Sequence, residues 1–229
     1  MTAVIHGISS MATRQVLAEL AAAYEQQAGG AVQIESVGGV DAARRVQAGE
    51  AFDVVVLASD AIDKLAASGA VAADGKVDLV RSPVAVAVRA GAPRPDIGTE
   101  EALRLAVQAA ASIGYSTGPS GTALLHLFER WGIAGEIRQR LVQAPPGVPV
   151  GSLVARGEVA LGFQQLSELI HLEGITVIGR LPETVRIITT FSGAPCAVSS
   201  QAEAVRRMLA IMASPETAAI KRRHGMEPA

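Results

Sequence analysis

Aromatic side chains, cysteines and net charge are all scarce in this chain of 229 residues. Aromatic residues make up 3% of it, too few to form the stacking platforms that bind single-stranded nucleic acid. The formal net charge of −2 offers no basic field to a nucleic-acid backbone, so we expect no nucleic-acid partner. The single cysteine, Cys196, excludes an internal disulfide and any zinc site built from cysteines.

Long uncharged apolar stretches are missing as well, and the first residues do not have the pattern of a signal peptide. Because no stretch approaches about 18 apolar residues without a charge, we expect no transmembrane helix and no insertion into a membrane. Residues Met1–Gly7 show neither a basic n-region nor a long apolar h-region. We therefore expect a periplasmic protein if a signal peptide has been removed, and a cytoplasmic one otherwise.

The chain is rich in apolar residues that can build a core. Hydrophobic residues make up 49% and charged residues 18%, which excludes a disordered chain. Apolar runs predict strands at Ala3–Ile8, Val32–Val37 and Phe52–Leu57, each followed by a pattern typical of a one-faced helix. Three such strand–helix units in succession predict a parallel sheet with helices on its faces.

Two long extended segments interrupt this rhythm and bracket a middle α/β block. They are Val77–Arg89, with Pro83 near its middle, and Val185–Phe191. Because Pro83 cannot donate to a sheet ladder, the first segment is either two strands or one strand that crosses between two bodies. The pattern predicts two lobes, residues 1–81 plus 188–229 and residues 82–187, joined by two crossover strands with a ligand cleft between them.

The predicted strand ends carry small and polar residues. Ser9-Ser10, Gly38-Gly39 and Ser59 follow strands of the first lobe, and ligands of open parallel sheets bind beyond such carboxyl ends. A serine at a strand-to-helix turn offers a hydroxyl and a backbone N–H at the positive end of the helix dipole. It either caps the helix or binds an anion, and an anion can share the same N–H groups.

A second loop of this kind, Ser116–Thr122, lies in the middle block. Gly118 and Gly121 let the backbone approach a ligand closely, and Pro119 is tolerated before the helix needs donors. The loop is not a Walker loop, because no Gly-Lys-Ser/Thr follows. It is either an anion-binding loop or an ordinary helix-start turn.

Three arginines lie near the turns of the first lobe. Arg14 lies one turn into the first predicted helix, and Arg44 and Arg45 belong to the second. A guanidinium beside a helix N-terminus strengthens the binding of a carboxylate or phosphate through a bidentate fork. The alternative is that all three are solvated surface residues.

Side chains for metal binding or nucleophilic catalysis are few and badly spaced. The histidines are His6, His126, His171 and His224. None pairs with another at metal-ligand spacing, so we expect no metal and no cofactor. No Gly-x-Ser-x-Gly elbow is present. His6, Tyr115 and Glu168 lie near strand ends and could act as acid or base, although such residues are more often structural.

Several longer stretches together resemble a known family. They are the Ser9-Ser10 turn, Ala42-Ala43-Arg44-Arg45-Val46-Gln47-Ala48-Gly49-Glu50, Phe52-Asp53-Val54-Val55-Val56 with Ala58-Ser59-Asp60, and Val154-Ala155-Arg156-Gly157-Glu158-Val159-Ala160-Leu161-Gly162-Phe163. Their order resembles the type II periplasmic-binding-protein fold, and within it the molybdate-binding group of ABC-transporter solute receptors. The resemblance covers nearly the whole chain and implies a two-lobed α/β fold, each lobe a mostly parallel sheet flanked by helices.

The resemblance also implies which residues hold a ligand. Molybdate receptors bind the oxyanion with two serines, with backbone N–H groups at two helix starts and with a tyrosine. By motif, the first serine matches Ser9 or Ser10, and the second falls at Gly38-Gly39, which has no hydroxyl. The helix starts match Ser120 and Val150, and the tyrosine falls on Gln165.

With two side-chain donors replaced, the resemblance favours a di- or tricarboxylate over molybdate, because a buried oxyanion needs a donor for nearly every oxygen. A glutamine pair and an arginine suit a larger organic anion. The expected ligand contacts are Ser9, Ser10, Met11, Arg14, Gly38, Gly39, Ser59, Thr117, Gly118, Ser120, Gly121, Thr122, Val150, Gln164 and Gln165.

Of three functions that remain open on this basis, the sequence favours the first. The first is a solute-binding protein that captures a small anion and passes it to the membrane component of an ABC transporter. The second is an isomerase of a small polycarboxylate, since aconitate isomerase is similar to the molybdate-receptor group and moves a double bond by a proton shift. The third is a cytoplasmic ligand sensor. Catalytic candidates for the second are His6, Ser10, Arg14, Tyr115 and Glu168.

Overall fold

The computed structural model describes residues 4–229, which divide into two compact units. Unit 1 comprises the described residues through Ser82 together with Thr189–Ala229, and unit 2 is Pro83–Ile188. One strand, β4 (Val77–Arg89), begins in unit 1 and ends in unit 2. Unit 2 is therefore an insertion between the two chain segments that build unit 1.

Unit 1 is built on a sheet in which β2, β1, β3 and β9 are neighbours in that order. These strands are β1 (Ile5–Ser10), β2 (Val32–Val37), β3 (Val54–Ala58) and β9 (Ile188–Pro195). The first three are parallel, and β9 runs antiparallel to β3. The start of β4 pairs with the short C-terminal β10 (Glu227–Pro228).

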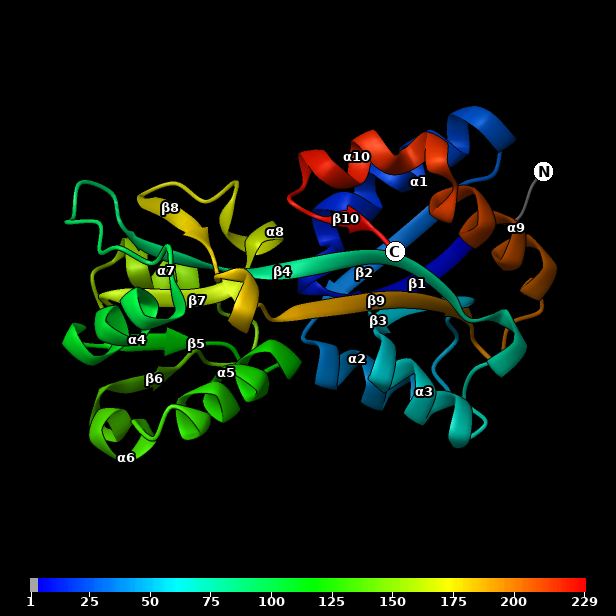
Figure 1. Ribbon diagram of the computed structural model, residues 1–229. Helices are drawn as coiled ribbons and strands as arrows, with labels where there is room; N and C mark the ends of the chain where they lie inside the picture. The colour runs from blue at the N-terminus through cyan, green and yellow to red at the C-terminus, as the bar shows by residue number, and fades with distance from the viewer. Residues whose placement is uncertain (1–3) are drawn as a thin grey trace. The chain divides into compact units, whose positions relative to one another are not determined.

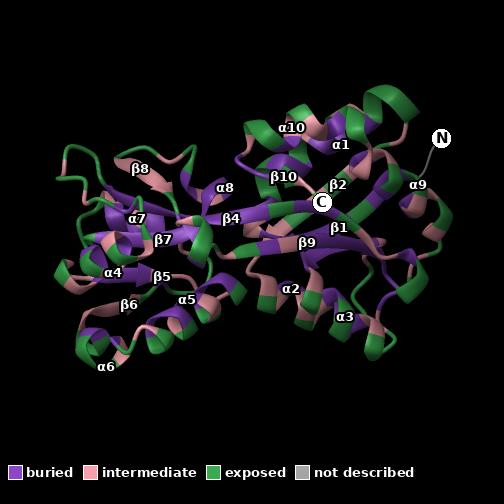
Figure 2. Cartoon of the chain, viewed as in Figure 1, coloured by how far each residue is buried: buried purple, intermediate pink, exposed green. Residues whose placement is uncertain are grey.

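Helices cover both faces of this sheet (Figure 1). One face carries α1 (Arg14–Ala28), α9 (Ala202–Ala213) and α10 (Ala218–Arg223), and the other carries α2 (Gly39–Gln47) and α3 (Ser59–Ala67). Because side chains alternate along a strand, Val54 and Val56 of β3 face the first layer, whereas Val55 and Leu57 face the second. All of β3 is buried (Figure 2), which explains its unbroken apolar sequence.

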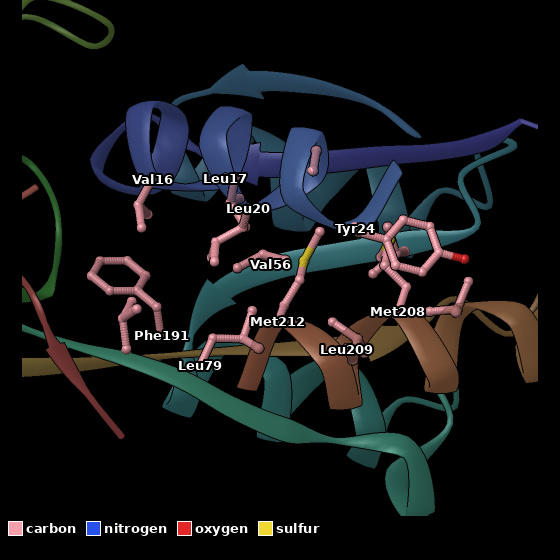
Figure 3. Packing of buried hydrophobic residues seen from close by; sticks show 14 of the residues in the cluster. Val16, Leu17, Leu20, Tyr24, Val56, Leu79, Phe191, Met208, Leu209 and Met212 are labelled. Carbon is pink, nitrogen blue, oxygen red and sulfur yellow. The ribbon is translucent and has the colours of Figure 1, made fainter. Parts of the chain in front are cut away.

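The larger core of unit 1 lies between α1, α9 and the sheet (Figure 3). Leu17 and Leu20 of α1 pack with Met208 and Leu209 of α9, and all four side chains are at most 1% exposed. Gly193 on β9 allows this approach, because a Cβ there would lie 2.5 Å from Leu209. Short 3-10 turns connect the elements at Met11–Thr13, Ala73–Gly75 and Pro215–Thr217.

Unit 2 is built on a second sheet in which β8, β4, β7, β5 and β6 are neighbours in that order. The new strands are β5 (Ile113–Tyr115), β6 (Leu141–Gln143), β7 (Leu161–Gln165) and β8 (Ile175–Arg180). Strands β5, β6 and β7 are parallel, and β4 runs antiparallel to β7 and β8.

The helices of unit 2 also lie on two faces of their sheet. They are α4 (Glu100–Ala109), α5 (Pro119–Arg130), α6 (Ala134–Ile137), α7 (Val150–Ala155) and α8 (Leu166–Leu169), with 3-10 turns at Arg138–Arg140 and Glu183–Val185. Residues from α4, α5 and α6 join one buried cluster with Val84, Val86 and Val88 of β4. The alternate β4 residues Ala85 and Ala87 pack with α8 on the other side.

Several strand boundaries in the structure differ from the predicted ones. The first strand was predicted at Ala3–Ile8, but β1 continues through Ser10 because Ser9 and Ser10 pair with Ser36 and Val37 of β2; Ala3 lies outside the described residues. The second extended segment was predicted at Val185–Phe191. A 3-10 turn occupies its start, and β9 begins at Ile188.

The first extended segment, in contrast, is confirmed as one strand over Val77–Arg89. Its antiparallel pairing resumes at Val84, directly after Pro83, which has no N–H to give to a ladder. Helix α7 begins at Val150, directly after Pro149, which disfavours helical backbone at the residue before it. No helix within residues 4–229 is both long and apolar enough to cross a membrane.

Candidate functional site

The carboxyl end of β1 in unit 1 holds two buried serines with different hydrogen bonds. The Ser9 Oγ lies 2.8 Å from the Oγ of Ser36, its register partner on β2. The Ser10 Oγ is buried and has no hydrogen-bond partner among the described residues. Ser10 precedes the 3-10 turn at Met11 without a side-chain capping bond, so the capping alternative does not account for it. An unsatisfied buried hydroxyl costs free energy, which a bound ligand atom would recover.

The start of α2 lies beside Ser10. Gly38 occupies the N-cap position and Gly39 is the first helical residue. A Cβ on Gly39 would come 3.7 Å from the Ser10 Cβ, and a Cβ on Gly38 would meet nothing within 4 Å. The missing side chains therefore leave space next to the Ser10 hydroxyl, at the helix end where backbone N–H groups and the dipole favour negative charge.

Arg14 begins α1 directly after this turn. It is exposed and makes no ion pair within the described part of the chain, and with Ser36 it lines a groove of about 580 Å³ along α1 and β2. Arg44 instead pairs with Asp41, and Arg45 pairs with Glu35 and Glu50. Of the three predicted arginines, Arg14 alone keeps its guanidinium available to an anion.

Two other predicted contacts of unit 1 have ordinary structural positions. Met11 lies half-buried in the 3-10 turn after Ser10. Ala58 is the N-cap residue of α3, and Ser59 is the first residue of the helix and makes no capping bond with its side chain.

In unit 2, the loop after β5 folds tightly over the first turn of α5. Gly118 is the N-cap residue, and the Oγ atoms of Ser116 and Ser120 are 3.2 Å apart. A Cβ on Gly121 would lie 1.9 Å from the Ser116 carbonyl oxygen, so only glycine fits there. Ser120 is buried, whereas Thr117 and Thr122 are exposed.

A buried polar network joins α7, β7 and α8. The Gly151 N–H at the start of α7 donates to the Gln164 Oε1 at 3.1 Å. The Gln164 side chain also bonds the carboxyl of Glu168. Gln164, which was predicted as a ligand contact, is 3% exposed, and its amide bonds both of these groups within unit 2. Val150, predicted as a backbone donor, is the buried first residue of α7, and Gln165 ends β7 in a buried position.

The predicted acid–base residues Glu168 and Tyr115 lie in unit 2, and His6 lies in unit 1. Glu168 lies in α8, just past the carboxyl end of β7, and burial raises its pKa to about 7. Tyr115 ends β5, which runs parallel to β7, so both lie at the same edge of the unit 2 sheet. His6 lies exposed at the amino end of β1, where its N–H donates to Asp53, so the structure does not bring it to Ser10. Burial raises the pKa of the Cys196 thiol to about 12, which makes it a poor nucleophile at neutral pH.

The sequence did not predict two hydrogen bonds of these sites. Ser36, which bonds Ser9, could have been found only from the parallel register of β1 and β2. The bond between Gln164 and the start of α7 joins residues from two different elements, and no local motif predicts it.

Comparisons with known proteins place these observations in a family. A family model described as bacterial extracellular solute-binding protein matches residues 5–227. An aconitate isomerase from Pseudomonas sp. is 39% identical over 227 residues, covering 96% of this chain and 86% of that protein.

Solved structures share the fold. The periplasmic molybdate-binding protein of Azotobacter vinelandii has a TM-score of 0.79 at 20% identity, covering 97% of this chain and 98% of that one. A sulfate-binding protein from Mycobacterium tuberculosis has a TM-score of 0.81 at 16% identity, covering 100% and 88%. The chain thus shares the α/β fold of these periplasmic binding proteins.

Proposed function

Because the chain belongs to the bacterial extracellular solute-binding protein family, we propose that it binds a small di- or tricarboxylate and moves a double bond within it. The observation that carries the proposal is the 39% identity to an aconitate isomerase over 96% of the chain. This similarity gives the isomerase precedence over the receptor that the sequence pattern favoured.

The polar groups of each unit support an anionic ligand. In unit 1, the unpaired guanidinium of Arg14 can form a bidentate pair with a carboxylate, and the Ser10 hydroxyl can donate to one of its oxygens. In unit 2, the first turn of the twelve-residue helix α5 offers backbone N–H groups beside the Ser116 and Ser120 hydroxyls.

The chemistry needs only the side chains of the protein. A double-bond shift next to carboxylates removes a proton from one carbon and returns a proton to another, so a single acid–base group suffices. Neither an electron acceptor nor a hydrolytic nucleophile takes part.

The second candidate is a receptor that binds the same ligand without chemistry and delivers it to a membrane transporter. The family assignment favours this candidate, since the family is named for extracellular solute binding.

One experiment separates the two candidates. The protein is incubated with cis- and trans-aconitate in deuterated water and followed by proton NMR, while calorimetry measures binding of both acids, tricarballylate and molybdate. An isomerase interconverts the two aconitates. A receptor binds at least one of them and leaves both unchanged, which would overturn the enzyme proposal. Submicromolar molybdate affinity without tricarboxylate binding would overturn both.

A further inference from the structure

Glu168 occupies an unusual position for a carboxylate. It lies in the single turn α8, whose other residues Leu166, Ser167 and Leu169 are all buried. The turn packs against β7 and β8, and its apolar residues join Ala85 and Ala87 of β4. Glu168 itself keeps partial access to solvent. The carboxyl group is thus largely surrounded by protein at the edge of the sheet where β5 and β7 end.

The Gln164 amide is held in one orientation. Its Oε1 accepts from the Gly151 N–H at 3.1 Å, which leaves the Nε2 group to donate to the Glu168 carboxyl. Because Gln164 is buried between two fixed partners, it can hold the carboxyl in place without carrying a charge. A neutral donor also leaves the carboxyl free to change its protonation state.

The charged groups around Glu168 are few. Strand β7 and helix α7 carry no titratable residue, β8 and β4 contribute the exposed Arg180 and Arg89 within unit 2, and the segment after α8 contributes the exposed His171 and Glu173. Burial is the largest cause that raises the Glu168 pKa, and the Gln164 hydrogen bond acts in the opposite direction. At a pKa of about 7, the acid and its conjugate base coexist at neutral pH, as a group that both takes and returns a proton requires.

Building on the proposed function, we propose that Glu168 is the catalytic acid–base of the double-bond shift and that Gln164 is its positioning residue. The Glu168 carboxylate takes a proton from the saturated carbon next to a substrate carboxylate. The electron pair of that C–H bond becomes the new double bond, and the electron pair of the old double bond moves to the far carbon. That carbon takes a proton from the Glu168 carboxylic acid, so the residue ends as it began and nothing is oxidised or reduced.

Four variants of the full chain test this role. They are Glu168→Gln, Glu168→Asp, Gln164→Met and, as a matched control, Glu173→Gln on the exposed carboxylate nearby. Each is assayed for interconversion of cis- and trans-aconitate by NMR, for aconitate binding by calorimetry, and for the pH dependence of kcat/KM.

We expect Glu168→Gln to lower kcat by about 10²–10⁴-fold, the usual contribution of a general acid–base, while the Kd for aconitate stays within a few-fold. Glu168→Asp should recover part of the rate, and Glu173→Gln should behave as the unmodified protein. In the unmodified protein, kcat/KM should rise with pH with a midpoint near pH 7. In Gln164→Met this midpoint should move to higher pH, because the variant loses the hydrogen bond that lowers the Glu168 pKa.

Two results would overturn the role of Glu168, and only one of them also refutes the proposed function. If the unmodified protein and Glu168→Gln interconvert the acids at rates within about tenfold, the proposed function stands and Glu168 is not its acid–base. If the unmodified protein binds aconitate without converting it, the proposed function fails and the role of Glu168 fails with it. Failure of Gln164→Met to fold affects neither conclusion, because the two Glu168 variants decide the role.

Discussion

At the scale of single residues, the protein keeps several polar groups in positions that cost stability. The Ser10 hydroxyl and the Lys221 ammonium are buried without a hydrogen-bond partner among the described residues, and Glu168 is a carboxyl in an apolar setting. Ser10 and Glu168 lie at carboxyl ends of strands, where binding is proposed. Lys221 lies on α10, and burial lowers its pKa, but its position is not explained by the proposed function.

Replacing Arg14 by alanine should weaken tricarboxylate binding without harming the fold. A charge-assisted hydrogen bond contributes about 1.5–3 kcal/mol, so the Kd should rise about 10- to 150-fold. Calorimetry measures this rise. The control Arg104→Ala removes a half-buried arginine paired with Glu101 on α4 of unit 2 and should leave the Kd unchanged. Equal affinities in the two variants would remove Arg14 from the site.

Glu168 should make stability depend on pH in a direction unusual for a carboxylate. Its folded pKa of about 7 lies above the ordinary carboxyl value of 4.5, so the folded state binds more protons than the unfolded state between these pH values. Stability therefore falls as pH rises through this window. Glu168→Gln should therefore be more stable than the unmodified protein at pH 8, by up to about 3 kcal/mol, and nearly equal to it at pH 4.5. Denaturant titrations at both pH values measure the difference. A constant difference across this range would mean that Glu168 titrates normally.

At the scale of secondary-structure elements, turns between strands and helices carry most of the specific geometry. The loop from β5 to α5 depends on Gly121, whose Cα faces the Ser116 carbonyl. Gly135 in α6 has open space around it and no such constraint. Substitution of Gly121 therefore tests a steric requirement, whereas substitution of Gly135 tests helix propensity alone.

Substituting Gly121 by alanine should displace the loop and abolish ligand binding. The added Cβ would lie 1.9 Å from backbone, a clash that no side-chain rotation relieves, so destabilisation should exceed the usual 1–3 kcal/mol of overpacking. Gly135→Ala should be neutral or stabilising by up to about 1 kcal/mol. Thermal unfolding and calorimetry on both variants check this, and a fully stable Gly121→Ala protein would show that the loop has another conformation.

Sequence periodicity predicted the helices and strands better than it predicted the contacts between them. The apolar run of β3 and the extended segment Val77–Arg89 are visible in the sequence because burial on both faces and the lack of turn residues are local properties. The start of β9 was predicted three residues too early because Val185 is a β-branched residue typical of strands, although it ends a 3-10 turn. The partner of Ser9 depends on sheet register, and that of Gln164 on the packing of α7 against β7; no local pattern encodes either.

At the scale of the whole molecule, each hydrophobic cluster belongs to one unit. The clusters around α1 with α9 and around α2 with α3 lie in unit 1. Those around α4 with α5, around α7 and around α8 lie in unit 2. Each unit therefore has a core of its own.

A cavity in one core should weaken that unit more than the other. Leu103→Ala in unit 2 should cost about 2–5 kcal/mol, since the side chain is fully buried. Hydrogen exchange followed by mass spectrometry should then show lost protection in peptides from Pro83–Ile188 and unchanged protection elsewhere. Leu20→Ala in unit 1 should give the reverse pattern. Equal loss in both units would mean that they unfold as one.

The insertion of unit 2 within unit 1 also imposes an order on synthesis. During translation, Pro83–Ile188 emerges as one continuous segment and can fold as soon as it leaves the ribosome. Unit 1 has to wait, because β3 pairs with β9 across a separation that includes the whole insertion, as in the pair Val54 and Pro195. Until β9 arrives, the nascent chain presents the unpaired edge of β3, whose five residues are all buried in the finished fold. During this period the unpaired, apolar strand edge is exposed, and the nascent chain is then at its most prone to aggregate.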